Sequence, residues 1–413
     1  MDLLRFITAG SVDDGKSTLI GRLLYDSKGI LADQLEAVER SSRLKGREGI
    51  DLALLTDGLR AEREQGITID VAYRYFATPK RKFIMADAPG HIQYTRNMVT
   101  GASMSDAIVV LVDARNGLVE QSRRHSIIAS LLKIRHVIVA VNKMDLAGFS
   151  RQVFEGIVED YTKMATRLGI DDVRFVPISA LEGDNVVEPS ERMPWYEGPT
   201  LLSLLEHLDL GGDIDLERPR MQVQCVIRPQ LPEWHDYRGY AGRICSGVFR
   251  TGDEVEVLPS GLRSRIQSIE NAGETVEEAF APMSVVLRLA DDIDIGRGDT
   301  IASGSSRPLV TSEFEAHICW LDEKPMQTGS RYLLQQNSRT VRAMVSGIVH
   351  RIDVNTLEQS EAYGRLALNE VARVRIRTAS PLAYDPYGTS KNNGAAILVD
   401  ETSNATVAAL MLL

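Results

Sequence analysis

The sequence is poor in cysteine, in positive charge and in long apolar runs, and each shortage excludes a class of protein. It holds 3 cysteines in 413 residues. Cys225, Cys245 and Cys319 form no Cys-x-x-Cys pair, so their spacing gives no support to a metal or redox site. We expect all of them to be buried as small apolar side chains in short strands.

No apolar run reaches the roughly 18–20 residues that a membrane-spanning helix needs. The longest candidate, residues 127–141, is interrupted by Lys133, Arg135 and His136. The N-terminus has no charged segment followed by an apolar segment and a small-residue cleavage site. From these absences we expect a cytoplasmic protein without a membrane partner.

Basic residues are outnumbered by acidic ones. The chain has 47 Lys and Arg against 57 Asp and Glu, for a formal net charge of −10. An acidic surface repels phosphate backbones and so disfavours non-specific nucleic-acid binding, although a local basic patch stays open. Arg373, Arg375 and Arg377 alternate along one strand face, where an acidic protein partner is a better match than nucleic acid.

The chain is too long to form a single hydrophobic core, and its pattern of apolar and polar residues changes along its length, which predicts several domains. Over residues 1–208, apolar β-branched runs alternate with helical patterns, which indicates a parallel sheet covered on both faces. The predicted strands are Leu4–Ala9, Lys82–Asp87, Ala107–Asp113, Val137–Asn142 and Arg174–Ile178, and the predicted helices include Lys16–Tyr25, Ser122–Lys133 and Phe154–Leu168.

The later part of the chain has a different pattern. Residues 209–219 are polar and glycine-rich and read as a linker. Short alternating strands with frequent turns follow over residues 220–306 and, after a break near 304–308, over residues 307–413, which predicts two β-barrels. In the first barrel Trp234, His235, Tyr237 and Tyr240 are expected to form an aromatic patch on a loop that faces solvent or a partner.

A phosphate-binding loop follows the first predicted strand and precedes a helix. Residues 10–17, Gly-Ser-Val-Asp-Asp-Gly-Lys-Ser, fit the pattern Gly-x-x-x-x-Gly-Lys-Ser/Thr. The glycines let backbone N–H groups surround a phosphate, Lys16 places its charge between the β- and γ-phosphates, and the Ser17 hydroxyl binds Mg²⁺. The nucleotide-binding residues predicted here are Gly10, Ser11, Val12, Asp13, Asp14, Gly15, Lys16, Ser17 and Thr18.

The base is indicated by Asn142-Lys143-Met144-Asp145, which ends a later strand. A carboxylate at Asp145 accepts hydrogen bonds from guanine N1–H and the 2-amino group, whereas adenine offers no such pair of donors. Lys143 can lay its aliphatic stem along the purine, and Asn142 can tie this segment to the phosphate loop. A backbone amide of Ser179-Ala180-Leu181 could meet guanine O6. Together these motifs predict GTP as the nucleotide.

Further residues are placed to sense the γ-phosphate. Asp87, at a strand end, can hold Mg²⁺ through water, and the Gly90 amide can bond the γ-phosphate. Thr68 can complete the Mg²⁺ shell only when the triphosphate is bound, so loss of that phosphate would release both loops. His91 can orient the attacking water, with a charged or a neutral imidazole both conceivable. The candidate catalytic residues are His91, Lys16, Asp13 and Thr68.

Taken together, these motifs resemble the GTPases of the elongation factor Tu type. The resemblance covers the whole chain and implies an α/β P-loop GTPase domain followed by two all-β barrel domains. In that family a histidine follows Asp-x-x-Gly, as His91 does here, and Val12 and Ile67 match the apolar pair that gates it. Asp13 matches the loop aspartate that accompanies a monovalent cation near the phosphates.

Within this superfamily, residues 87–146, His350–Glu358 and the close at 397–409 are similar to the large GTP-binding subunits of bacterial ATP sulfurylase. This resemblance implies that GTP hydrolysis drives the synthesis of adenosine 5′-phosphosulfate and pyrophosphate from ATP and sulfate on a smaller catalytic partner subunit. It also implies that no nucleic acid binds. The alternative is a translation elongation or release-type GTPase; the acidic charge weighs only mildly against it.

Overall fold

The computed structural model describes residues 2–27, 52, 71–88, 95–210, 214–229, 237–353, 358–361 and 364–413. The chain forms two compact units: the first is built from residues 1–209, and the second holds both β-rich segments. Within the described ranges no helix is long and apolar enough to cross a membrane.

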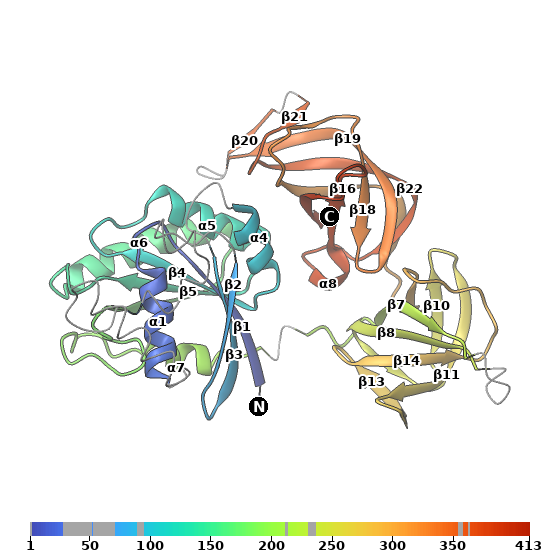
Figure 1. The fold of residues 1–413 in the computed structure, drawn as a ribbon, viewed down its shortest axis with the longest axis horizontal. Helices are drawn as coiled ribbons and strands as arrows, with labels where there is room; N and C mark the ends of the chain where they lie inside the picture. The colour runs from blue at the N-terminus through green and yellow to red at the C-terminus, as the bar shows by residue number, and fades with distance from the viewer. Residues whose placement is uncertain are drawn as a thin grey trace. The chain divides into compact units, whose positions relative to one another are not determined.

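The first unit is an α/β layer structure built on a six-stranded sheet in the order β2-β3-β1-β4-β5-β6 (Figure 1). Its pairs are parallel except for the antiparallel β2–β3 hairpin at one edge. The strands are β1 Asp2–Ala9, β2 Ala72–Ala77, β3 Arg81–Asp87, β4 Ala107–Asp113, β5 His136–Asn142 and β6 Asp172–Pro177. The helices are α1 Lys16–Asp26, α4 Thr95–Ser103, α5 Glu120–Leu131, α6 Arg151–Leu168 and α7 Leu201–Glu206.

Local sequence explains why these elements form. Every residue of β4 and β5 is buried, as expected for strands that helices cover on both faces. Helix α6 begins where the Ser150 hydroxyl accepts a hydrogen bond from the Val153 N–H, and it ends at Gly169 in the left-handed conformation. The predicted strands and helices of this unit are therefore confirmed, with ends shifted by a few residues.

The candidate site lies at the edge of this sheet where the parallel strands have their carboxyl ends. Strands β1, β3, β4, β5 and β6 all end at this edge. Because parallel strands end at the same edge of a sheet, the phosphate loop, Asp87 and the Asn142–Asp145 segment share one rim.

The first β-rich segment is a barrel. Its main sheet is seven-stranded, in the order β10-β15-β7-β8-β14-β11-β12, and the β10–β11 pairing closes it. The strands are β7 Arg220–Ile227, β8 Gly239–Ser246, β9 Val248–Arg250, β10 Glu254–Leu258, β11 Leu262–Asn271, β12 Glu274–Val276, β13 Glu278–Phe280, β14 Ser284–Leu289 and β15 Thr300–Ser303. Strands β9 and β13 pair separately.

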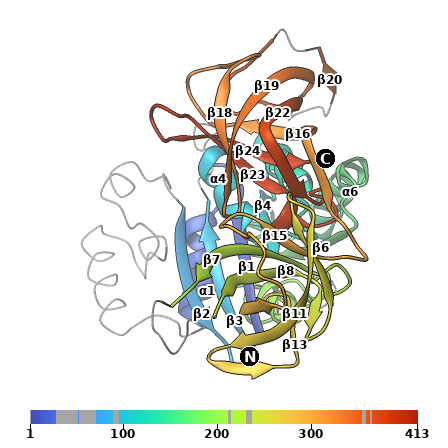
Figure 2. The ribbon, with the colours of Figure 1, turned by 90° about the vertical axis from the view of Figure 1, so that its right-hand side faces the viewer.

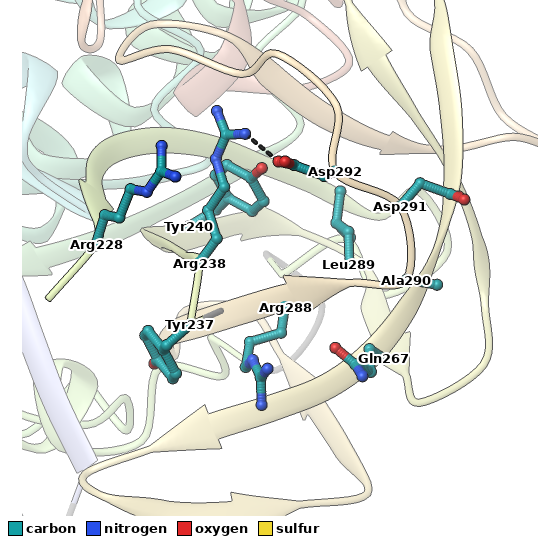
Figure 3. Close-up of a pocket in the computed structure, with 10 residues that line it drawn as sticks. All are labelled: Arg228, Tyr237, Arg238, Tyr240, Gln267, Arg288, Leu289, Ala290, Asp291 and Asp292. Atoms are coloured by element: carbon teal, nitrogen blue, oxygen red, sulfur yellow. Dashed lines mark hydrogen bonds and ion pairs between the residues drawn. The ribbon is translucent and has the colours of Figure 1, made fainter. Parts of the chain in front are cut away.

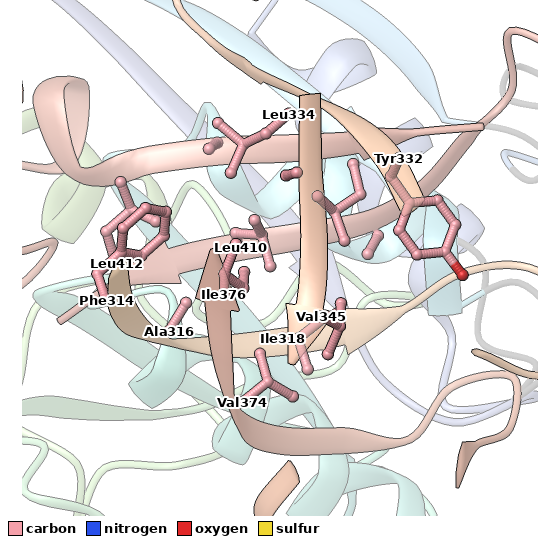
Figure 4. Packing of buried hydrophobic residues seen from close by; sticks show 14 of the residues in the cluster. Phe314, Ala316, Ile318, Tyr332, Leu334, Val345, Val374, Ile376, Leu410 and Leu412 are labelled. Atoms are coloured by element: carbon pink, nitrogen blue, oxygen red, sulfur yellow. The ribbon is translucent and has the colours of Figure 1, made fainter. Parts of the chain in front are cut away.

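The second β-rich segment is also a barrel, in the order β18-β23-β24-β16-β22-β19-β20, closed by β18–β19. Its elements are β16 Leu309–Trp320, β17 Met326–Gln327, β18 Arg331–Gln336, β19 Arg339–Ile352, β20 Gln359–Ser360, β21 Arg365–Leu366, β22 Val371–Tyr384, α8 Lys391–Gly394, β23 Ala395–Val399 and β24 Thr406–Leu412. Figure 2 shows β16, β19 and β22 curving around a common interior. Inward side chains such as Phe314, Ile376 and Leu410 fill it (Figure 4). The predicted architecture, an α/β domain followed by two barrels, is confirmed.

A buried ion pair joins the two barrels. Arg220, on β7, donates from Nε to Asp385 Oδ2 at 3.0 Å and from Nη2 to Oδ1 at 3.2 Å. Their side chains are 1% and 9% exposed. Asn393 adds a hydrogen bond from Nδ2 to Asp385 Oδ2 at 2.7 Å. Both charges are therefore paired where water cannot solvate them.

Surface expectations for the barrels need correction. Cys319 is buried and Cys245 is half-buried. Cys225 is exposed, because the register of β7 shifts between Val223 and Cys225 and turns that side chain outward. Tyr240 is not a loop residue: it lies in β8 and is buried in the barrel core. A hydrophobic ring that fits the period of a strand packs inward, so the expected loop patch was wrong for this residue.

The alternating arginines of β22 lie opposite acidic residues of β16. Arg373 and Arg375 donate to Glu315 at 2.6 Å and 3.1 Å, and Arg377 to Glu313 at 3.3 Å. The two strands are antiparallel neighbours. These guanidinium groups thus already have carboxylate partners within the barrel.

Candidate guanine-nucleotide site

The phosphate loop is a tight turn held by its own side chains. Gly15 precedes α1 with φ +92°, and Asp13 also has a left-handed backbone, with φ 67°. The Ser11 N–H donates to Asp14 Oδ2 at 2.6 Å. The buried Lys16 ammonium donates to the carbonyls of Gly10 and Ser11, each at 2.9 Å. Burial lowers the pKa of Lys16, and the nearby carboxylates of Asp87 and Asp14 oppose that shift.

Asn142 joins the phosphate loop to the loop after β6. Its Nδ2 donates to the Asp14 carbonyl at 2.7 Å, and its Oδ1 accepts from the Ala180 N–H at 2.9 Å. A Cβ on Gly15 would lie 2.5 Å from Asn142 Nδ2, so this contact requires glycine. Sequence reasoning anticipated the tie between Asn142 and the phosphate loop, and the structure brings these residues together.

Asp145 is oriented by a second contact across the same rim. The Ser179 hydroxyl donates to Asp145 Oδ1 at 2.7 Å and also accepts from the Glu182 N–H at 3.2 Å. Ser179 is fully buried, whereas Leu181 is 64% exposed. The carboxylate is therefore fixed in direction by a buried hydroxyl, as a residue that reads a base edge must be.

Two residues of this rim had not been singled out from the sequence. Arg22, on α1, donates from Nε to the Ala180 carbonyl at 3.2 Å and from Nη2 to the Leu181 carbonyl. Asp113, the last residue of β4, is 2% exposed and pairs with Lys143 at 3.0 Å. A charged residue at the carboxyl end of a fully apolar strand was the available signal for Asp113.

Oxygen donors suited to Mg²⁺ lie beside the phosphate loop. Ser17 is in the first turn of α1, and Asp87, at the end of β3, is 2% exposed and stands opposite Thr8 in the register with β1. Hydroxyl and carboxylate oxygens are the protein ligands that Mg²⁺ prefers when phosphate oxygens supply the rest. These residues therefore fit that ion. Thr68, Gly90 and His91, and Ile67 beside them, lie outside the described residues.

A separate pocket lies in the first barrel, in the second compact unit (Figure 3). The Arg288 guanidinium stacks over the Tyr237 ring at 4.9 Å, and Arg238 pairs with Asp292. The Tyr237 hydroxyl donates to Glu270 at 2.9 Å, and burial together with Glu270 raises the pKa of Tyr237 to about 12. Basic and acidic groups offset one another here, so the pocket carries no strong charge of one sign.

Known protein families match all three parts of the chain. The family described as "Elongation factor Tu GTP binding domain" matches residues 1–211, and "Elongation factor Tu domain 2" matches residues 240–302. The family "GTP-eEF1A C-terminal domain-like" matches residues 313–413.

Curated relatives align over the full chain. A protein of Mycobacterium tuberculosis (strain ATCC 25618 / H37Rv), named "Bifunctional enzyme CysN/CysC", is 57% identical over 100% of this chain and 67% of its own length. Proteins named "Sulfate adenylyltransferase subunit 1" are 54% identical in Laribacter hongkongensis, over 85% of that protein, and 51% identical in Alteromonas mediterranea, over 87%. Both alignments cover 100% of this chain. The chain therefore belongs to the sulfate adenylyltransferase subunit 1 family, within the GTPases of the elongation factor Tu type.

Proposed function

We propose that this chain binds GTP with Mg²⁺ and hydrolyses it as one subunit of a sulfate adenylyltransferase. The energy released drives a smaller partner subunit to form adenosine 5′-phosphosulfate and pyrophosphate from ATP and sulfate. The observation that carries the nucleotide assignment is the rim on which Asn142 ties the phosphate loop to Ala180 while Ser179 orients Asp145. The sulfate reaction rests on relatives at 51–57% identity that carry that name.

Each side chain of the rim has a distinct role in binding. Asp145 accepts two hydrogen bonds from guanine, and the Lys143 stem packs along the purine face. Lys16 would donate to the β- and γ-phosphates, and Ser17 and, through water, Asp87 would hold the Mg²⁺. When bound, the ion neutralises the charge that builds up on the phosphate oxygens. By resemblance to the family, Asp13 would accompany a monovalent cation near the phosphates.

Hydrolysis transfers the γ-phosphoryl group to water. The bond between the γ-phosphorus and the oxygen it shares with the β-phosphate breaks, a bond to the water oxygen forms, and GDP and phosphate leave. By resemblance to the family, His91 orients that water and Thr68 orders with the triphosphate. A His91→Ala variant should keep GTP affinity and lose turnover, and unchanged turnover would remove His91 from the mechanism.

Asp145→Asn tests the base assignment. An amide cannot accept both guanine donors, but its NH₂ group can donate to the C2 oxygen of xanthine. We expect GTP affinity to fall at least about a hundredfold, because bonds to charged groups contribute about 1.5–3 kcal/mol each, and XTP affinity to rise. Asp160→Asn, at an exposed α6 carboxylate, is the matched control. Unchanged GTP affinity in Asp145→Asn would contradict the assignment.

Coupling to sulfate activation is tested by the rate of GTP hydrolysis with and without ATP, sulfate and the purified partner. A nucleotide can drive another reaction only if the partner binds the GTP and GDP forms differently. We expect hydrolysis to accelerate only when ATP, sulfate and the partner are all present. GTP-dependent binding of aminoacyl-tRNA instead would favour the translation alternative. GTP hydrolysis and the formation of adenosine 5′-phosphosulfate both consume nucleotides of the cytoplasm, and we propose that the protein is located in the cytoplasm.

A further inference from the structure

The carboxylate of Asp113 is buried next to the Asn142–Asp145 segment, and no role has been assigned to this residue. Asp113 ends β4 directly beside Asn142, which ends β5 in the same register. Its side chain is 2% exposed. A carboxylate removed from water at this depth needs strong partners, since an uncompensated buried charge is destabilising.

Two cations, Arg115 and Lys143, supply those partners. Arg115 donates from Nε to Oδ1 at 3.0 Å and from Nη2 to Oδ2 at 2.7 Å, and its own N–H donates to Oδ1 at 2.9 Å. Lys143 lies 3.0 Å from Oδ2. Burial by itself raises the pKa of Asp113, but the hydrogen bonds from Arg115 and Lys143 outweigh it and hold that pKa well below its usual range.

Lys143 is the residue that connects this carboxylate to the phosphate loop. Its ammonium donates to the Asp13 carbonyl as well as to Asp113, and its side chain is 22% exposed. Both Lys143 and Asp13 have left-handed backbones, with φ 62° and φ 67°, a conformation that non-glycine residues hold only when their contacts enforce it. The Lys143 side chain is thus held at its tip by two groups.

We propose that Asp113 is a positioning residue that clamps the Lys143 ammonium against the phosphate loop and thereby sets how slowly guanine nucleotides leave. This inference rests on the proposed GTP site and adds a residue to it. With its tip fixed, the Lys143 stem is prepared to pack on the purine, so less conformational entropy is lost on binding. Without Asp113, the ammonium keeps only a neutral carbonyl partner and the stem gains freedom.

The test is the dissociation rate of a fluorescent guanosine diphosphate from the full chain. Asp113→Asn keeps the shape and removes the charge, and we expect release to accelerate about tenfold. In a Lys143→Met background the same substitution should change release by less than about twofold, because the group it positions is absent. Asp172→Asn, at the amino end of β6, removes another ion-paired carboxylate of the same sheet and should leave release unchanged.

Equal acceleration by Asp113→Asn with and without Lys143 would overturn the proposal, because it would mean that Asp113 only stabilises the turn after β4. Unchanged release in Asp113→Asn would overturn it as well. If Asp145→Asn still changes the preference of the site from GTP to XTP in that case, the proposal of a GTP site is unaffected. If the unaltered chain binds no guanine nucleotide, both the function and this inference fail.

A measurement on the unaltered chain covers the case in which Asp113→Asn does not fold. The ammonium protons of Lys143, assigned by their loss in Lys143→Arg, should exchange with water at least about tenfold more slowly than those of the exposed Lys163. Exchange as fast as that of Lys163 would overturn the clamp.

Discussion

The ion pair between the barrels allows a quantitative prediction. Arg220→Met removes a guanidinium that is 1% exposed and leaves Asp385, 9% exposed, with the Asn393 amide as its remaining donor. Breaking a buried pair from one side costs about 3–5 kcal/mol, because the other charge is left without a counterion in a region that water does not reach. We expect the free energy of unfolding of the second compact unit, which holds both barrels, to fall by that amount.

Differential scanning calorimetry of the full chain measures the effect. For a unit of 150–250 residues, each kcal/mol shifts Tm by about 2–4 °C, so the barrel transition should move down by roughly 6–20 °C. Arg250→Met is the control: it breaks a pair with Glu278 at 3.2 Å whose side chains are 60% and 55% exposed. Exposed pairs contribute less than about 1 kcal/mol.

The double variant Arg220→Met, Asp385→Leu separates pairing from packing. Replacing both charges removes the uncompensated carboxylate, so the double variant should recover at least half of the stability lost by Arg220→Met. A single-variant loss below about 1 kcal/mol would refute the reasoning. A double variant whose loss of unfolding free energy equals the sum of the two single-variant losses would refute it as well.

Two further predictions concern the first unit. Gly15→Ala should weaken GTP binding more than tenfold in a nucleotide titration, because its Cβ would lie 2.5 Å from Asn142 Nδ2; Gly117→Ala, also at positive φ but with nothing within 4 Å, should not. Burial lowers the pKa of His125 to about 3, against about 6.5 when unfolded, so the unfolded chain binds more protons between these values. Through this group, the free energy of unfolding should therefore fall by about 2 kcal/mol from pH 7.5 to pH 5. Urea denaturation of His125→Gln at both pH values checks this, because that variant should not show the loss.

Local spacing in the sequence was sufficient to predict the architecture of the chain. The period of apolar residues reports which elements are covered on one face or both, so β4 was predicted with its observed ends, Ala107 and Asp113. The phosphate loop and the Asn142–Asp145 segment are short enough that each motif specifies its own geometry. Because parallel strands end at one edge, their order along the chain also implied that they meet.

The partners of the buried charged groups were decided only by the tertiary structure. Lys143 is 130 residues from Asp13, and Arg220 is 165 residues from Asp385. No local period encodes which buried charge will meet which, because that depends on the register of neighbouring strands and on how two barrels pack together. The outward turn of Cys225 likewise follows from a register shift that its neighbours in sequence do not reveal.

The sequence by itself thus determined the kinds of element and which short motifs meet at one edge of the sheet, since each motif is a short stretch of chain and parallel strands end at the same edge. The tertiary structure alone decided which charges support that rim from behind, Asp113 for Lys143 and Arg22 for the loop after β6. The physical reason is that the cost of burying a charge depends on where its counterion lies in space, and the fold sets that distance.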